Sequence, residues 1–370
     1  MMKGRDRNSP CWCGSGIKYK NCHYDRHDQT KDNPWDAVAK NRKAFQQKIC
    51  SARDVGLGSC DGGVIKAHTV SRGPNLSKIA NGGHVMHYAA NISEMNKNGG
   101  KLSIEKIGIS DASVFYGFCR KHDRELFSCI ENEPFAGRWD QCLAVAYRTI
   151  SRERYGKDAV SNLREILRGA DKGMPLMQQM RLQGMIEAID LGNRAAQQDI
   201  KATFDVLVEA LVQKQPNVIR SRIFEFDSVL PFMFAGAWSP FTDLYGVRLQ
   251  IGYADELLEQ IIVSSFAGVK GSSICLSWRD LPGAPGKAIV EQIEALPSQQ
   301  RGGACLQLVA KHVENIFFNI DWFGSLSDTQ RKTLDRLVFS GVDAMGSPPS
   351  AQISLDLEFT LPNLVRSYSV

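Results

Sequence analysis

Apolar residues recur at every third or fourth position along the middle of the chain. Between residues 176 and 213 this repeat is carried by Leu182, Met185, Ile189, Ala196, Ile200, Phe204, Leu207 and Leu211. Because residues at this spacing share one side of a helix, the repeat predicts a single long amphipathic helix. The same spacing predicts shorter helices over residues 35–49 and 136–157. Long helices with a sustained apolar stripe also pair across subunits, so we predict a homodimer.

From about residue 217 the apolar positions instead alternate, or run without interruption over the length of a strand. Segments of this kind begin near Ile223 and recur over residues 244–253, 259–268, 272–281 and 351–360. Helical spacing returns over residues 298–319 and 327–340. We therefore predict an α+β unit whose strands lie in one sheet.

A short polar segment near the start of the chain holds four side chains that suit a metal ion. Cys11, Cys13, Cys22 and His23 lie around a Gly-Ser-Gly turn. Thiolates with one imidazole are a ligand set that tetrahedral zinc prefers. A segment this short has no apolar core, so metal binding would supply its folding free energy, about 10–16 kcal/mol in structural zinc peptides.

The same segment resembles the SEC-C zinc motif, best known from the C-terminal tail of the preprotein translocase ATPase. That family's pattern is Cys-x-Cys-x8-Cys followed by Cys or His, with a Gly-Ser-Gly-x-Lys-Tyr core. Residues 14–19 reproduce the core, and the three cysteines and the histidine fall on the four ligand positions. The resemblance implies a small zinc finger over residues 1–25.

A second group of cysteines and histidines follows the first predicted helix. Cys50 and Cys60 bracket a glycine-bearing turn, and Cys119 and His122 stand where a helix is expected to begin. A thiolate pair on a turn and a second pair at a helix N-terminus is the layout of a treble-clef zinc site, so we predict these four as ligands. His68, at the end of an apolar strand, could replace Cys50 as the fourth ligand. Alternatively, the cysteines are buried free thiols and the histidine belongs to the core.

The second group also resembles the zinc-bearing HNH endonucleases. In that family a catalytic histidine ends a strand soon after the second zinc cysteine, and a catalytic-metal ligand directly follows the last zinc pair. His68 and Asp123 stand at these positions, although Ala67 replaces the metal-binding residue that usually precedes the histidine. The resemblance implies that His68 activates water as a general base and that Asp123 helps to hold Mg²⁺ or Mn²⁺. A rival register uses His68, Asn75 and His84.

Charge is distributed unevenly along the chain. The 370 residues carry a net charge of +5, and residues 1–50 alone hold eleven Lys or Arg against five Asp. A basic head on an otherwise near-neutral chain indicates contact with nucleic acid or another polyanion. The alternative interpretation of such a charge run is an ordinary solvated surface.

Composition excludes several classes of protein. The chain is 43% hydrophobic and 23% charged, as in soluble globular proteins. No apolar run reaches the length of a membrane span, and the polar, basic start predicts no signal peptide. Ten cysteines in a chain of this length, clustered beside histidines, favour metal binding in a reducing cytoplasm over a disulfide scaffold. Dinucleotide-binding, Walker A and Gly-x-Ser-x-Gly patterns are absent.

Together these patterns predict an α+β multi-domain protein with two zinc sites. The expected ranges are a finger over 1–25, a treble-clef or HNH-like module over 35–135, a helical region over 136–215 and an α+β sheet domain over 217–370. The first functional hypothesis is a nucleic-acid-associated zinc protein with an HNH-like nuclease site, acting in bacterial defence or nucleic-acid processing. The second is a non-catalytic zinc scaffold whose finger docks a protein or ribosomal partner.

Overall fold

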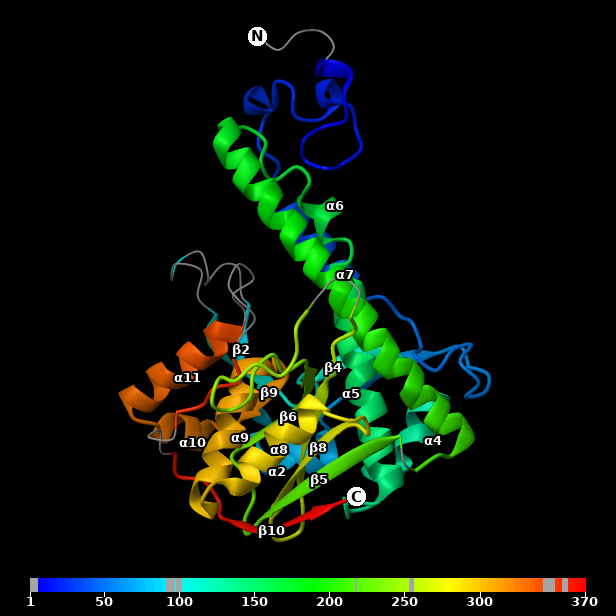
Figure 1. Cartoon of the computed structure of the whole chain (residues 1–370), viewed down its shortest axis with the longest axis vertical. Coiled ribbons are helices and arrows are strands. Elements are labelled where there is room, and N and C mark those ends of the chain that lie inside the picture. Colours follow the sequence, from blue (N-terminus) through cyan, green and yellow to red (C-terminus); the bar gives the residue numbers. More distant parts are fainter. Residues whose placement is uncertain are drawn as a thin grey trace. The chain divides into compact units, whose positions relative to one another are not determined.

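The structure, a computed structural model, describes residues 6–90, 97, 102–216, 218–252, 256–341, 350–354 and 359–370. Its secondary structure is a mixture of helices and strands (Figure 1). The chain divides into two compact units, Met1–Gln47 with Tyr155–Gln198, and Lys48–Arg154 with Asp199–Val370. Two helices, α5 (Trp139–Val160) and α7 (Leu176–Gln213), contribute residues to both units.

The long helix predicted from the apolar stripe is confirmed. Helix α7 begins and ends at the expected residues and is 38 residues long (Figure 1). Ile200, Phe204 and Leu207 of the stripe are buried, whereas Leu182 and Met185 are half-buried. The homodimer concerns a second chain and stays a prediction.

The first unit joins the N-terminal segment to helical segments that follow it much later in the chain. Its shorter elements are the 3-10 turns η1 (Asp6–Asn8), η2 (Tyr19–Asn21) and η3 (Arg26–Asp28) and the helices α1 (Pro34–Ala44) and α6 (Leu163–Leu167). The side chain of Asn33 accepts the N–H of Trp35 at 3.1 Å and caps α1. Pro34 occupies the first helical position, where no backbone donor is needed.

Helix α1 is shorter than the predicted helix over residues 35–49. It ends at Ala44, and residues 47–50 have no helical structure. The N–H of Ser51 instead donates to the carbonyl of Gly117 at 2.7 Å. The N–H of Ile49 also donates to the carbonyl of Tyr116 at 3.3 Å, so the chain before Cys50 is bound to this segment instead of continuing the helix.

The second unit is built on an antiparallel sheet of eight strands in the order β10-β5-β8-β7-β6-β9-β2-β3. The strands are β2 (His84–Ala89), β3 (Ser103–Gly108), β5 (Ile219–Phe226), β6 (Phe232–Trp238), β7 (Ile261–Ala267), β8 (Ser272–Arg279), β9 (Ile316–Phe318) and β10 (Leu364–Ser369). Strands β2 and β3 come from the predicted module over 35–135, and the other six from the predicted domain over 217–370. Strands from two of the predicted ranges therefore lie in one sheet of the second unit.

Helices cover both faces of this sheet. Along β8, Ile274, Leu276 and Trp278 belong to the main apolar core, which also contains residues of α8 (Pro285–Ala295) and α9 (Ser298–His312). The alternate residue Cys275 faces α5 instead, with its Sγ 4.0 Å from that of Cys142. The alternation follows from the period of a strand, whose successive side chains point to opposite faces.

Two predicted segments differ from the structure. Residues 244–252 of the predicted strand over 244–253 contain no strand. Tyr245 and Val247 are 57% and 62% exposed, so their alternation has no sheet to pack against. The helix predicted over 298–319 ends at His312, and its last residues form β9. The strand predicted over 351–360 includes residues 355–358, which lie outside the described residues.

A separate two-stranded sheet carries the second group of cysteines and histidines. It pairs β1 (Val64–His68) with β4 (Val114–Cys119), and α4 (Arg120–Glu131) begins directly after β4. Aromatic rings link these elements to the helices, because Phe118 contacts Phe127 at 4.9 Å and Tyr147 at 5.8 Å between ring centroids. The other described elements of this unit are η4 (Arg72–Leu76), α2 (Ser77–Ile79), α10 (Ile320–Ser325) and α11 (Asp328–Gly341). No helix within the described ranges is long and apolar enough to cross a membrane.

Candidate metal centres

The first cluster is formed by a tight reversal of the chain after Cys11. The N–H of Cys11 donates to the carbonyl of Ile17 at 2.8 Å, and the N–H of Tyr19 donates to that of Ser9 at 2.9 Å. Gly14 and Gly16 have φ angles of +69° and +70°, a region that favours glycine. The reversal brings Cys22 and His23, which follow η2, back to the first two cysteines.

The first cluster has the dimensions of a tetrahedral zinc site. The ligand atoms of Cys11, Cys13, Cys22 and His23 all lie within 4.8 Å of one another. The Sγ atoms of Cys13 and Cys22 are 3.6 Å apart, and Nδ1 of His23 lies 3.2 Å from Sγ of both Cys11 and Cys22. Zinc bonds of about 2.3 Å to sulfur and about 2.0–2.1 Å to nitrogen imply edges of about 3.5–3.8 Å in a tetrahedron. The donor set and its spacing fit zinc.

The second nitrogen of His23 is bound by a buried carboxylate. Its Nε2 lies 2.7 Å from Oδ2 of Asp171, and both side chains are 0% exposed. Burial lowers the pKa of His23 in spite of the neighbouring carboxylate, which favours the neutral imidazole that a metal needs. Nδ1 is therefore the nitrogen that faces the three sulfur atoms.

The second cluster lies at the open end of the β1–β4 pair. Cys119 is the last residue of β4, opposite Val64, and His122 lies in the first turn of α4. Cys50 is fixed beside them, since the N–H of Cys119 donates to its Sγ at 3.3 Å. Cys60 reaches the same point from the loop before β1.

The second cluster has the same dimensions as the first. Nδ1 of His122 lies 3.4 Å from Sγ of Cys50, 3.7 Å from Sγ of Cys60 and 3.3 Å from Sγ of Cys119. All four ligand atoms lie within 4.8 Å of one another. The Nε2 of His122 is 3.1 Å from the carbonyl oxygen of Leu57, in the loop between the first two cysteines. This donor set also fits zinc.

Burial acts on the thiols of both clusters. It raises the pKa of Cys11 to about 12 and that of Cys50 to about 12. A metal ion that binds these sulfur atoms must displace their protons, and its charge offsets the cost of burying thiolates.

His68 does not belong to the second cluster. Cys50 occupies the position for which His68 was the alternative, and Nε2 of His68 lies 3.1 Å from the carbonyl oxygen of Ile109. A carbonyl can only accept, so Nε2 carries the proton and Nδ1 keeps its lone pair. Burial lowers the pKa of His68, which is half-buried.

Asp123 follows His122 on α4, as the sequence requires. Its Oδ1 is buried and has no hydrogen-bond partner within the described part of the chain. Burial raises its pKa, and the positive charge of Arg148 opposes this effect. Asp123 is not part of any group of three or more close metal-ligating side chains that the described residues form, so this finding gives the predicted Mg²⁺ or Mn²⁺ site no support.

The three residues of the rival register, His68, Asn75 and His84, each form hydrogen bonds with different partners. Oδ1 of Asn75 accepts the N–H of Ala267 at 3.0 Å, and the side chain is 2% exposed. His84 is exposed at the start of β2, with its Nδ1 2.9 Å from the carbonyl oxygen of Gly82. These contacts give Asn75 a structural role in the core.

Two groups at the metal centres were not anticipated from the sequence. Asp171 is 148 residues from His23 and stands alone in a polar turn, so no spacing connects them. Leu57 contributes through its backbone, which no side-chain motif can indicate.

Comparison with known proteins agrees with the first cluster. Residues 7–25 match the family model described as the SEC-C motif. No curated protein matches the chain, and neither does any solved structure. The motif and the two clusters together support a zinc-binding protein, whereas the likeness of the second cluster to HNH and treble-clef modules stays a prediction.

Proposed function

We propose that this chain is a zinc-stabilised nucleic-acid-binding protein of the cytoplasm, in which both zinc ions are structural. Each cluster offers four protein ligands and is largely buried. Structural zinc sites are closed by four protein ligands, whereas catalytic sites keep a position open for water. The ten cysteines are free thiols, which suits a reducing compartment.

The observation that carries nucleic-acid binding is the set of unpaired cations on the finger. Lys18 and Lys20 are exposed and form no ion pair with any other described residue. The indole of Trp12 is 40% exposed and lies against the ring of His23, with 4.4 Å between centroids. Exposed cations beside an exposed aromatic ring are the elements of a surface on which bases stack while phosphates are neutralised.

Fluorescence anisotropy with a labelled single-stranded oligonucleotide tests this proposal. Affinity should fall with salt, and each of Lys18→Ala and Lys20→Ala should reduce the slope of log K against log salt by about 0.7–1. Lys78→Ala, an exposed lysine of the second unit, is the matched control. Absence of binding by the zinc-loaded chain would reject nucleic-acid association and favour a scaffold whose finger docks a protein or ribosomal partner.

A second candidate function, an HNH-like nuclease, is favoured by one observation. The bond from Nε2 of His68 to Ile109 fixes the tautomer in which Nδ1 can accept a proton, and burial keeps the ring neutral. A neutral, oriented imidazole is what a general base requires.

Plasmid nicking with Mg²⁺ or Mn²⁺ tests the nuclease. His68→Ala should abolish cleavage and leave the zinc content intact, and a parental rate in His84→Ala would exclude the rival register that uses His84. If His68→Ala instead loses one equivalent of zinc, His68 supports the metal centre. Cleavage that survives in His68→Ala would reject its role as the base.

A further inference from the structure

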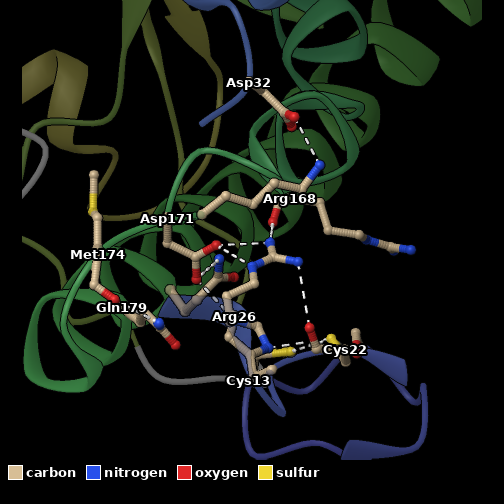
Figure 2. A network of polar contacts seen from close by, with 12 residues as sticks. Cys13, Cys22, Arg26, Asp32, Arg168, Asp171, Met174 and Gln179 are labelled. Atoms are coloured by element: carbon tan, nitrogen blue, oxygen red, sulfur yellow. Dashed lines mark hydrogen bonds and ion pairs between the residues drawn. The ribbon is translucent and has the colours of Figure 1, made fainter. Parts of the chain in front are cut away.

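Asp171 carries a fully buried charge in the segment between α6 and α7, and neither function proposed above uses it. Its side chain is 0% exposed. Oδ2 accepts from Nε2 of His23 at 2.7 Å and from Nε2 of Gln183 at 2.8 Å. Oδ1 accepts from Nε of Arg26 at 2.7 Å (Figure 2). Burial alone would raise the pKa of Asp171, but the donors from His23, Arg26 and Gln183 hold it below its usual value.

The finger and the Asp171 segment are also joined through their backbones. The guanidinium of Arg26 donates to the carbonyl of Arg168 (Figure 2). The N–H of Gly173 donates to the carbonyl of Arg26 at 3.0 Å. Arg164 donates to the carbonyl of Cys13 at 3.0 Å. These bonds come from both sides of Asp171 along the chain, so the carboxylate lies at the centre of a continuous contact.

This arrangement has a recognised physical role at metal sites. A ligating imidazole usually donates its other N–H to a carboxylate or carbonyl, which fixes the ring and makes the ligating nitrogen more basic. In the first cluster Nδ1 of His23 faces the sulfur atoms and Nε2 faces Asp171. Conversely, the buried carboxylate needs these donors, because an unpaired buried charge strongly destabilises a fold.

We infer that Asp171 is a positioning residue of the first zinc site, and that zinc binding and folding of the α6–α7 segment are coupled through it. The inference rests on the first cluster and is independent of nucleic-acid binding. Zinc orients His23. The side chains of His23 and Arg26 then hold Asp171, which holds the turn that leads into α7. Loss of the metal therefore loosens residues 168–183 as well as the finger.

Zinc transfer to a chromogenic chelator, followed on the full-length zinc-loaded chain, tests the inference. Zinc release should show one phase for each site. A Cys13→Ser chain, which lacks a ligand of the first site, identifies the phase that belongs to the second. Asp171→Ala should lower the affinity of the first site about 10- to 100-fold, with the second phase unchanged. Asp171→Asn keeps one oxygen that can accept from His23, so its loss should be smaller. Asp28→Asn is the matched control, because that carboxylate is 72% exposed in the same unit.

Two further measurements separate positioning from general stability. Cobalt in place of zinc should show shifted d–d bands in Asp171→Asn, since the basicity of the imidazole changes. Hydrogen exchange of residues 168–183 should accelerate in Cys22→Ser. A folded Asp171→Ala chain with parental zinc affinity would overturn the inference. Should that variant fail to fold, parental affinity and parental cobalt bands in Asp171→Asn would overturn it equally.

Discussion

The Nε2 atom of His122 lies 3.1 Å from the carbonyl oxygen of Leu57, so the imidazole that completes the second cluster also holds the loop between Cys50 and Cys60. The ligand is therefore supported by the same loop that supplies two of its neighbours. Because the carbonyl of Leu57 belongs to the backbone, a side-chain substitution cannot remove it. The site is therefore tested by substitution of His122.

Replacement of His122 should separate its two roles. His122→Ala should lower the zinc content from two equivalents to one, because three thiolates without a fourth protein ligand no longer close the site. His122→Cys should retain two equivalents, since a four-cysteine set also suits structural zinc, but it loses the bond to Leu57. Zinc content by elemental analysis, with proteolysis of the 50–60 loop as a second readout, checks both variants. Two equivalents in His122→Ala would contradict the assignment of this ligand.

Removal of zinc should unfold the first unit more completely than the second. Among described residues 7–25 of the finger only Cys11, Cys22 and His23 are buried, whereas the second unit contains a large buried core around its eight-stranded sheet. We expect a chelator to abolish the thermal transition of the finger and to lower the midpoint of the main transition. Calorimetry with and without chelator measures both, and restoration by added zinc is the control. An unchanged thermogram would contradict structural metal sites.

The ion pair of the buried Arg148 and the half-buried Glu131 should respond asymmetrically to substitution. Their charged groups are 2.5 Å apart, and the side chains are 4% and 32% exposed. Glu131→Leu leaves a buried guanidinium without its carboxylate and should destabilise the chain by about 3–5 kcal/mol. Arg148→Met leaves a carboxylate that water can still reach, so its cost should be smaller. Urea unfolding of both single variants and the double variant provides the comparison, and equal costs would contradict the argument.

His312 should make stability fall as the pH is lowered. Burial, with a smaller effect of the neighbouring Lys311 charge, lowers the pKa of His312 to about 3. Between its usual pKa of about 6.5 and this value, the unfolded chain binds a proton that the native chain does not. The contribution of His312 to the free energy of unfolding is therefore fully present above pH 6.5. Below that pH it falls by about 1.4 kcal/mol per pH unit.

His312→Phe removes this contribution and keeps the stacked contact with Trp238, whose ring centroid lies 4.9 Å away. Urea unfolding at pH 7.5, 6.5 and 5.5 should show a shallower loss of stability in the variant than in the parent. Identical pH profiles would show that His312 does not titrate differently in the two states.

The sequence predicted which cysteines and histidines lie together, because these residue types have few roles in such clusters. All eight predicted ligands converge in the two groups, although Cys60 and Cys119 are separated by 58 intervening residues that the motif did not constrain. Helix α7 was also predicted, because an apolar stripe records burial on one side of a helix directly.

Contacts between residues far apart in the chain could not be predicted from the sequence. Strand order depends on pairings between distant segments, so nothing local indicated that β2 and β3 extend the sheet beyond β9. Residues 244–252 show that alternation alone is insufficient, since an exposed loop can carry the same pattern. Asp171 was missed because a single aspartate has no period, and its role is defined by partners far away in the chain.

The composition of the first unit has a practical consequence for shortening this protein. Residues 1–47 and 155–198 form one compact unit, although the first segment resembles an appended tail in the sequence. A chain trimmed at residue 47 would leave Asp171 without His23 and Arg26, exposing a desolvated acid and the surface around it. Such a truncated chain should be prone to aggregation, and its behaviour would report on this damage rather than on the absence of a finger.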